Sequence, residues 1–197
     1  MATSATICNI ALGHIGVTRL ISSLTQTTTE AVQCNLYFET ARDAVLADYA
    51  WPFATAYSAL GLVAEDPSDD WLYAYRYPSD CIRVRRIVTG IGRRDMNPPA
   101  FAIGQDAQGR LIYTDQPDAT IEYTVRVSDP SRFDALFSEA LSWRMAAFLA
   151  PSLGRVQGAQ NTALQTYERT IGKARSTAAN EAQQQPQAES EFVRARD

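Results

Sequence analysis

The spacing of apolar residues changes twice along this chain, and that change limits the folds open to it. Residues 3–16 and 28–50 place apolar side chains three or four positions apart, which predicts amphipathic helices. From Phe53 to about Val127, short runs of β-branched and aromatic residues alternate with turn residues, which predicts strands. Helical spacing returns after Asp129-Pro130. We therefore expect an α+β fold, in which N- and C-terminal helices form an antiparallel bundle and an antiparallel β lobe is inserted between them.

The first two predicted helices differ in how much of their surface is apolar. The first, from Thr3 to Gly16, has one apolar side. The second runs from about Thr28 to Ala50, and Thr27 with Glu30 fits the capping box that starts many helices. It carries two apolar stripes, Ala31, Cys34, Phe38, Ala41 and Val45 on one side and Val32, Leu36, Leu46 and Tyr49 on the other. Two stripes predict a helix that is covered on much of its circumference, in the middle of the bundle.

Two further helices are predicted near the C-terminus. The third begins at Asp129-Pro130, because Asp followed by Pro in the first turn is a common start signal, and it ends at Pro151 and Gly154. The fourth spans about residues 155–179 and would be roughly 37 Å long at 1.5 Å per residue.

Six strands are predicted for the β lobe, with Asp66-Pro67 among the breaks between them. The candidate strands are Tyr57–Ala64, Trp71–Tyr77, Ile82–Thr89, Ala100–Ile103, Arg110–Thr114 and Thr120–Val127. In the last of these, Ile121, Tyr123, Val125 and Val127 alternate with Glu122, Thr124 and Arg126. That alternation predicts one buried face and one face in water.

Residues 181–197 differ in composition from the rest of the chain. The polar run there cannot bury enough apolar surface to hold its own structure, yet it is followed by an aromatic residue and two arginines. The segment is either an extended arm that binds a partner through Phe192, Val193, Arg194 and Arg196 or a terminus without such a role. The expected organisation is a discontinuous helical unit (1–55 and 128–180), an inserted lobe (56–127) and this arm (181–197).

Charge and cysteine content narrow the possible functions. The net charge of −4 argues against nonspecific DNA coating, which needs a basic face. No run of about 20 apolar residues exists, and no secretory signal pattern opens the chain, so we expect synthesis in a cytoplasm. Three widely spaced cysteines form no metal or redox pair, and Cys8 and Cys34 fall on apolar helix faces, as buried free thiols do.

The residues that could carry out chemistry are few, so we expect no enzyme activity, metal or cofactor. His14 is the only histidine and is predicted to be a core or interface residue. The acidic cluster Glu65, Asp66, Asp69 and Asp70 is the best candidate for carboxylate catalysis, but we expect a solvated loop there. The densest basic patch is Arg83, Arg85, Arg86, Arg93 and Arg94. For these arginines, contact with another subunit or with a tail component, or a solvated strand face, is favoured over nucleic-acid binding.

Several segments together resemble the tail tubular protein A and head-to-tail connector adaptor family of short-tailed phages. The N-terminal pattern is Asn9-Ile10-Ala11-Leu12-Gly13-His14-Ile15-Gly16 followed by Ile21-Ser22-Ser23-Leu24. It continues through Glu30-Ala31, Cys34, Tyr37, Arg42-Asp43, Leu46 and Trp51-Pro52-Phe53-Ala54. The C-terminal pattern is Phe133–Phe137, Glu139-Ala140-Leu141, Leu149-Ala150-Pro151, Tyr167, Ala174 and the closing Phe-Val-Arg-Ala-Arg. The β lobe matches only in kind.

This resemblance implies a structural protein of the virion, located at the junction of head and tail. The family forms a dodecameric ring between the portal protein and the tail nozzle (tail tubular B-type) protein, around a channel through which DNA passes without specific binding. The bundle packs against neighbouring copies, the C-terminal arm reaches the portal, and the β lobe meets the nozzle; no membrane is involved. Two alternatives remain, a cell-wall muramidase-type adaptor and a small cytoplasmic protein that binds a ligand in its β lobe.

Overall fold

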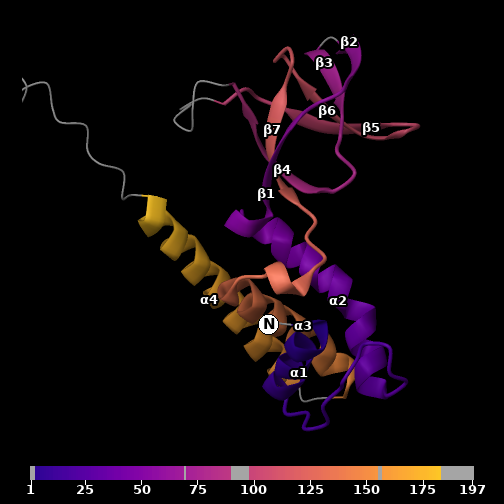
Figure 1. Cartoon of the computed structure of the whole chain (residues 1–197), viewed down its shortest axis with the longest axis vertical. Coiled ribbons are helices and arrows are strands. Elements are labelled where there is room, and N and C mark those ends of the chain that lie inside the picture. Colours follow the sequence, from indigo (N-terminus) through magenta and orange to yellow (C-terminus); the bar gives the residue numbers. More distant parts are fainter. Residues whose placement is uncertain (1–2, 69, 90–97, 155–156, 183–197) are drawn as a thin grey trace, which may run out of the picture.

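The computed structural model describes residues 3–68, 70–89, 98–154 and 157–182 of the 197-residue chain. Within these ranges the fold is mixed α+β, with four α-helices and two antiparallel sheets. Two helices precede the strands in the sequence and two follow them. Figure 1 shows the helices gathered at one end of the molecule and the strands at the other.

The first two helices begin at threonine caps. Helix α1 (Ser4–His14) starts where the Thr3 side chain accepts a hydrogen bond from the backbone N–H of Thr6. Helix α2 (Thr29–Asp48) starts one residue later than the predicted capping box, because Thr28 is the residue whose hydroxyl accepts from the Ala31 N–H. The prediction of Thr27 as the cap was therefore wrong by one position.

The start predicted for the third helix was also wrong. Asp129-Pro130 opens only a short 3-10 turn (Pro130–Arg132), and helix α3 (Ala135–Ser152) begins after Asp134, whose carboxylate accepts from the Phe137 N–H at 2.6 Å. Both aspartates carry the cap chemistry, and the sequence pattern selected the earlier one. Helix α4 (Gln157–Ala182) follows Gly154, whose positive φ of 66° turns the chain.

Helix α3 packs against α1, α2 and α4, and their apolar faces share one buried cluster. Trp51 anchors this cluster, because its ring packs edge-on against Phe137 and its indole N–H donates to the Val45 carbonyl at 2.8 Å. The first stripe of α2 lies in the cluster, but the second is covered only near the C-terminal end of the helix. Val32 and Leu36 are 50% and 61% exposed, so the prediction that α2 is covered on both sides is wrong for these two residues in the single chain.

The described part of the lobe contains two antiparallel sheets with seven strands, one strand more than the six predicted. One sheet has the order β1-β7-β4 and the other the order β2-β3-β6-β5. The strands are β1 (Thr55–Ala59), β2 (Leu62–Ser68), β3 (Trp71–Arg76), β4 (Cys81–Val88), β5 (Ala102–Asp106), β6 (Gly109–Thr114) and β7 (Thr120–Val125).

Two strand predictions need correction. The predicted strand Tyr57–Ala64 is divided at Leu60-Gly61, and its halves join different sheets. The predicted break at Asp66-Pro67 lies inside β2, where the pairing register with β3 shifts and Asp66 adopts a φ of +46°. An irregularity of this kind lets an edge strand accommodate a proline without ending.

Buried aromatic and aliphatic side chains fill the space between the two sheets. The cluster consists of Tyr75, Tyr77, Cys81, Val84, Ile87, Ile112, Ala119, Ile121 and Tyr123. The predicted alternation in β7 holds for Ile121 and Tyr123 but fails for Thr124, which is only 1% exposed. Its hydroxyl accepts a hydrogen bond from Arg85 Nε at 2.8 Å, and this contact explains why a polar residue is buried on the face expected to be wet.

The same arginine joins the lobe to the helices. Arg85 Nη2 donates to the carbonyl oxygens of Leu46, Ala47 and Tyr49, at 3.0, 3.2 and 2.6 Å. These carbonyls lie at the C-terminal end of α2, where backbone acceptors lack intrahelical partners and the helix dipole favours positive charge. Arg85 of β4 therefore caps α2 from the neighbouring sheet.

We expect Arg85→Met to lower the free energy of unfolding by about 2–4 kcal/mol, because it removes charged hydrogen bonds and leaves partly buried carbonyls unpaired. Arg83→Met is the matched control on the same strand, since the exposed Arg83 donates a single bond to the Ala47 carbonyl at 3.2 Å. That variant should cost about 0.5 kcal/mol or less. Urea unfolding of both variants measures the difference, and equal losses would contradict the capping role.

Candidate functional site

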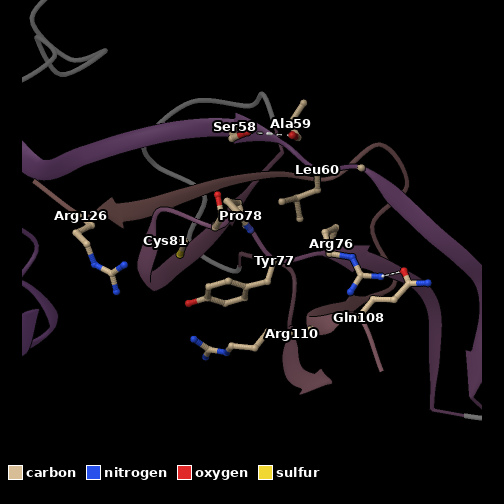
Figure 2. Close-up of a pocket in the computed structure, with 13 residues that line it drawn as sticks. Ser58, Ala59, Leu60, Arg76, Tyr77, Pro78, Cys81, Gln108, Arg110 and Arg126 are labelled. Atoms are coloured by element: carbon tan, nitrogen blue, oxygen red, sulfur yellow. Dashed lines mark hydrogen bonds between the residues drawn. The ribbon is translucent and has the colours of Figure 1, made fainter. Parts of the chain in front are cut away.

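A pocket of about 720 Å³ lies in the β lobe (Figure 2). Three chain connections contribute to its lining, namely the β1–β2 link at Leu60-Gly61, the β3–β4 link at Pro78-Ser79 and the β5–β6 turn at Gln108-Gly109. Its lining consists of Ser58, Ala59, Leu60, Gly61, Arg76, Tyr77, Pro78, Ser79, Cys81, Gln108, Gly109, Arg110 and Arg126. This lining includes three arginines and no acidic residue.

One of the three arginines, Arg76, is held by a carboxylate. Its Nη1 and Nη2 atoms donate to Asp106 Oδ1 and Oδ2, both at 2.9 Å, and Nη2 also donates to Gln108 Oε1 at 3.2 Å. The hydrogen bonds from Arg76 lower the pKa of Asp106 to about 2, so this pair stays ionised at neutral pH. The pair fixes the β5–β6 turn against β3.

A second arginine, Arg110, lies over an aromatic ring. Its guanidinium carbon is 4.0 Å from the centre of the Tyr77 ring, a cation–π contact. Burial, followed by contact with the Cys81 thiol, raises the pKa of Tyr77 to about 12, so its hydroxyl remains a neutral hydrogen-bond donor at neutral pH. In the view of Figure 2 the Tyr77 hydroxyl points to the same side as the Arg110 guanidinium.

The third arginine connects the pocket to the helices. Arg126 Nε donates to Asp43 Oδ2 of α2 at 3.0 Å, and Asp43 Oδ1 accepts from the buried Arg42. The backbone N–H of Arg126 donates to the Asp80 carbonyl at 2.8 Å. Asp43 therefore bridges one arginine of α2 and one that follows β7.

The arginines singled out from the sequence lie elsewhere. Arg83 and Arg85 contact the C-terminal end of α2, and Arg86 forms an ion pair with Glu122 at 2.7 Å. Arg93 and Arg94 lie outside the described residues. Sequence reasoning missed the pocket arginines because Arg76, Arg110 and Arg126 are far apart in the chain and only the pairing of the strands brings them to one pocket.

The described members of the acidic cluster lie where water surrounds them. Glu65 and Asp66 lie on β2 and Asp70 lies in the turn that follows, and all three are exposed; Asp69 is outside the described residues. A general acid needs an apolar environment that keeps its proton at neutral pH, and an exposed carboxyl group lacks one. Among the residues with described positions, no group of three or more His, Cys, Asp or Glu side chains could hold a metal ion.

The helical end of the molecule presents apolar side chains to solvent. Val32 and Leu36 lie one turn apart on the outer side of α2, and Leu36 borders a groove of about 430 Å³ between α2, Ser4 and Leu24. Ile10 of α1 and Leu20 of the following loop are also exposed. The neighbours of these two residues, Asn9 and Ile21, are joined by two hydrogen bonds of 2.8 and 2.9 Å.

The cysteines and the histidine belong to the packed interior. Cys8, Cys34 and Cys81 are buried free thiols, as predicted for the first two. His14 stacks on Trp143 with ring centres 3.5 Å apart, and its Nε2 lies 3.1 Å from Ser142 Oγ. Because the Ser142 hydroxyl donates to the Glu139 carbonyl, His14 Nε2 is the donor in its contact with Ser142 Oγ. Burial lowers the pKa of His14, so the neutral imidazole is favoured in the folded state.

The lowered pKa predicts a pH effect on stability. The unfolded chain binds a proton at His14 near its ordinary pKa of about 6.5, while the folded chain binds it only at lower pH. The contribution of His14 to stability is therefore complete above that pH and is lost as pH falls toward the folded pKa. We expect the free energy of unfolding to decrease more between pH 7.5 and 5.5 in the parent than in His14→Gln, as measured by urea unfolding. Parallel pH profiles would contradict this prediction.

The chain matches no protein-family model, and no curated protein is similar to it in sequence. No described helix combines the length and the apolar content needed to cross a bilayer. The four residues predicted to form the C-terminal arm contact, Phe192, Val193, Arg194 and Arg196, lie outside the described part of the chain.

Proposed function

We propose that this protein is a structural head-to-tail adaptor of a short-tailed phage, a ring of copies that joins the portal to the tail nozzle around the DNA channel. The observation that carries the proposal is the exposed stripe of α2. The inner stripe of that helix is buried against α3, while Val32 and Leu36 face solvent in the single chain. A second copy of the chain is the partner proposed to cover them.

Energetic considerations favour a partner for this stripe. Full burial of a valine or leucine side chain contributes about 1.5–3 kcal/mol, so covering what is exposed at both positions is worth a few kcal/mol. Isolated exposed apolar residues are common, but here two lie one turn apart beside a groove, with Ile10 and Leu20 also exposed on the N-terminal part. A ring repeats one such contact around its axis, so each copy contributes the same stripe.

The other parts of the chain fit the same proposal. The four helices form the bundle that packs between copies, the β lobe is directed toward the nozzle protein, and residues 183–197 reach the portal. The net charge of −4 suits a channel through which DNA slides, because an acidic protein does not displace counterions from phosphate. The virion, at the junction of head and tail, is the proposed location.

The first test concerns the α2 stripe. We expect Val32→Gln/Leu36→Gln to abolish or greatly reduce assembly on the cognate portal ring, because it replaces the apolar contact with polar groups that remain hydrated. Glutamine is a good helix former, so α2 itself should persist. Mass photometry of the protein alone and mixed with the portal ring measures the number of copies added.

The matched control applies the same chemistry to the lobe. Leu72→Gln/Ile103→Gln replaces two side chains that are also about half exposed, at 51% and 42%, and it should leave portal assembly unchanged. Normal assembly of the α2 variant would show that this stripe is not the subunit contact. A parent protein that ignores the portal would refute the adaptor function as a whole.

The second test concerns the C-terminal segment. We expect removal of residues 183–197 to leave the thermal unfolding midpoint unchanged, since the deletion begins after the last residue of α4, and to prevent docking on the portal. Arg194→Gln/Arg196→Gln in the full chain tests whether the positive charge of these two residues is by itself required for docking on the portal. A truncated protein that joined portal rings as the parent does would contradict the role of the arm.

A further inference from the structure

We infer that the pocket in the β lobe is a binding site for a small ligand that carries a carboxylate or phosphate group, held by Arg110 and Arg126. This inference does not depend on the adaptor function. The volume of about 720 Å³ lies within the range of roughly 300–1,000 Å³ that is usual for small-ligand pockets.

The hydrogen-bond donors that remain free determine the chemical class of the ligand. Each guanidinium offers five N–H donors. Arg76 uses three hydrogen bonds on Asp106 and Gln108, so most of its capacity is occupied. Arg126 uses only Nε, on Asp43. The Arg110 guanidinium contacts the ring and the hydroxyl of Tyr77 and forms no ion pair with any residue that the structure describes. The unused donors of Arg110 and Arg126 match the forked geometry that carboxylates and phosphates accept.

The acidic groups near the pocket do not occupy the arginine donors that would bind an anion. Asp106 and Asp43 are already paired with Arg76 and Arg126. The Asp80 carboxylate accepts hydrogen bonds from the Tyr123 hydroxyl at 3.3 and 3.4 Å, and Asp80 is not part of the pocket lining. Arg110 is therefore the lining cation without a carboxylate partner in the described chain.

The rest of the lining selects a ligand with an apolar part. The Tyr77 ring fixes the Arg110 guanidinium, which lowers the conformational entropy lost when an anion binds. Leu60 and Pro78 add apolar surface beside the ring, and Figure 2 shows both labelled around the same hollow. The expected ligand is thus an anionic group attached to a flat or aliphatic body.

Three probes of matched shape test the site by NMR titration of the full-length protein at constant ionic strength. Benzoate and phenyl phosphate carry the two anionic groups, and benzamide is the neutral analogue. We expect saturable shifts at the backbone amides of Tyr77, Gly109 and Arg110 with one or both anions. The stronger binder identifies the carboxylate or the phosphate class. Benzamide binding as well as the anions, or no saturable shift at these amides, would overturn the inference.

Two variants separate the site from general electrostatic attraction. Arg110→Gln should weaken binding of the anions by about tenfold or more, because it removes the charged hydrogen bonds. Arg169→Gln removes the same charge from an exposed position on α4 and should leave binding unchanged within about twofold. Equal weakening in both variants would overturn the inference, and the amide spectrum of each variant shows at the same time whether its fold is intact.

Discussion

The largest set of hydrogen bonds between the sheets and the helices comes from one arginine. Arg85 extends from β4 to three carbonyl oxygens at the end of α2 and to the Thr124 hydroxyl, so a single guanidinium joins two strands and a helix. Burial lowers the pKa of Arg85, but an arginine starts so far above neutral pH that it stays charged. A charged donor at the negative end of a helix dipole suits that position. The lobe is thereby attached to the helix that carries the exposed apolar stripe.

An ion pair also joins the lobe to the helices. Asp43 of α2 accepts from Arg42 within the helix and from Arg126 after β7, and Arg126 lines the pocket of the lobe. The Arg126–Asp43 pair therefore connects the lobe pocket to α2, although the proposed ring contact and the proposed ligand site are different surfaces. Arg85 and Arg126 both contact α2, so a substitution at either arginine also changes the support of the helix proposed to contact a neighbouring copy.

Local sequence signals predicted the elements well but placed several of their ends wrongly. The helices at both ends and the strands between them follow from hydrophobic spacing, and this mixed α+β class is confirmed. The cap of α2 is Thr28 and not Thr27, and that of α3 is Asp134 and not Asp129, because neighbouring residues with equal capping chemistry give the same sequence signal. The division at Leu60-Gly61 was missed because the apolar run continues across it while the strands enter separate sheets.

What the sequence determined by itself was the order and type of the elements, the buried thiols of Cys8 and Cys34, and the absence of residues suited to a histidine metal site, since each depends on local spacing or composition. Only the tertiary structure decided which apolar and charged side chains remain available. Val32 and Leu36 were expected to be covered, and Arg85 was expected at a surface contact. Arg76, Arg110 and Arg126 meet in one pocket through strand pairing between residues far apart in the chain, which no local pattern encodes.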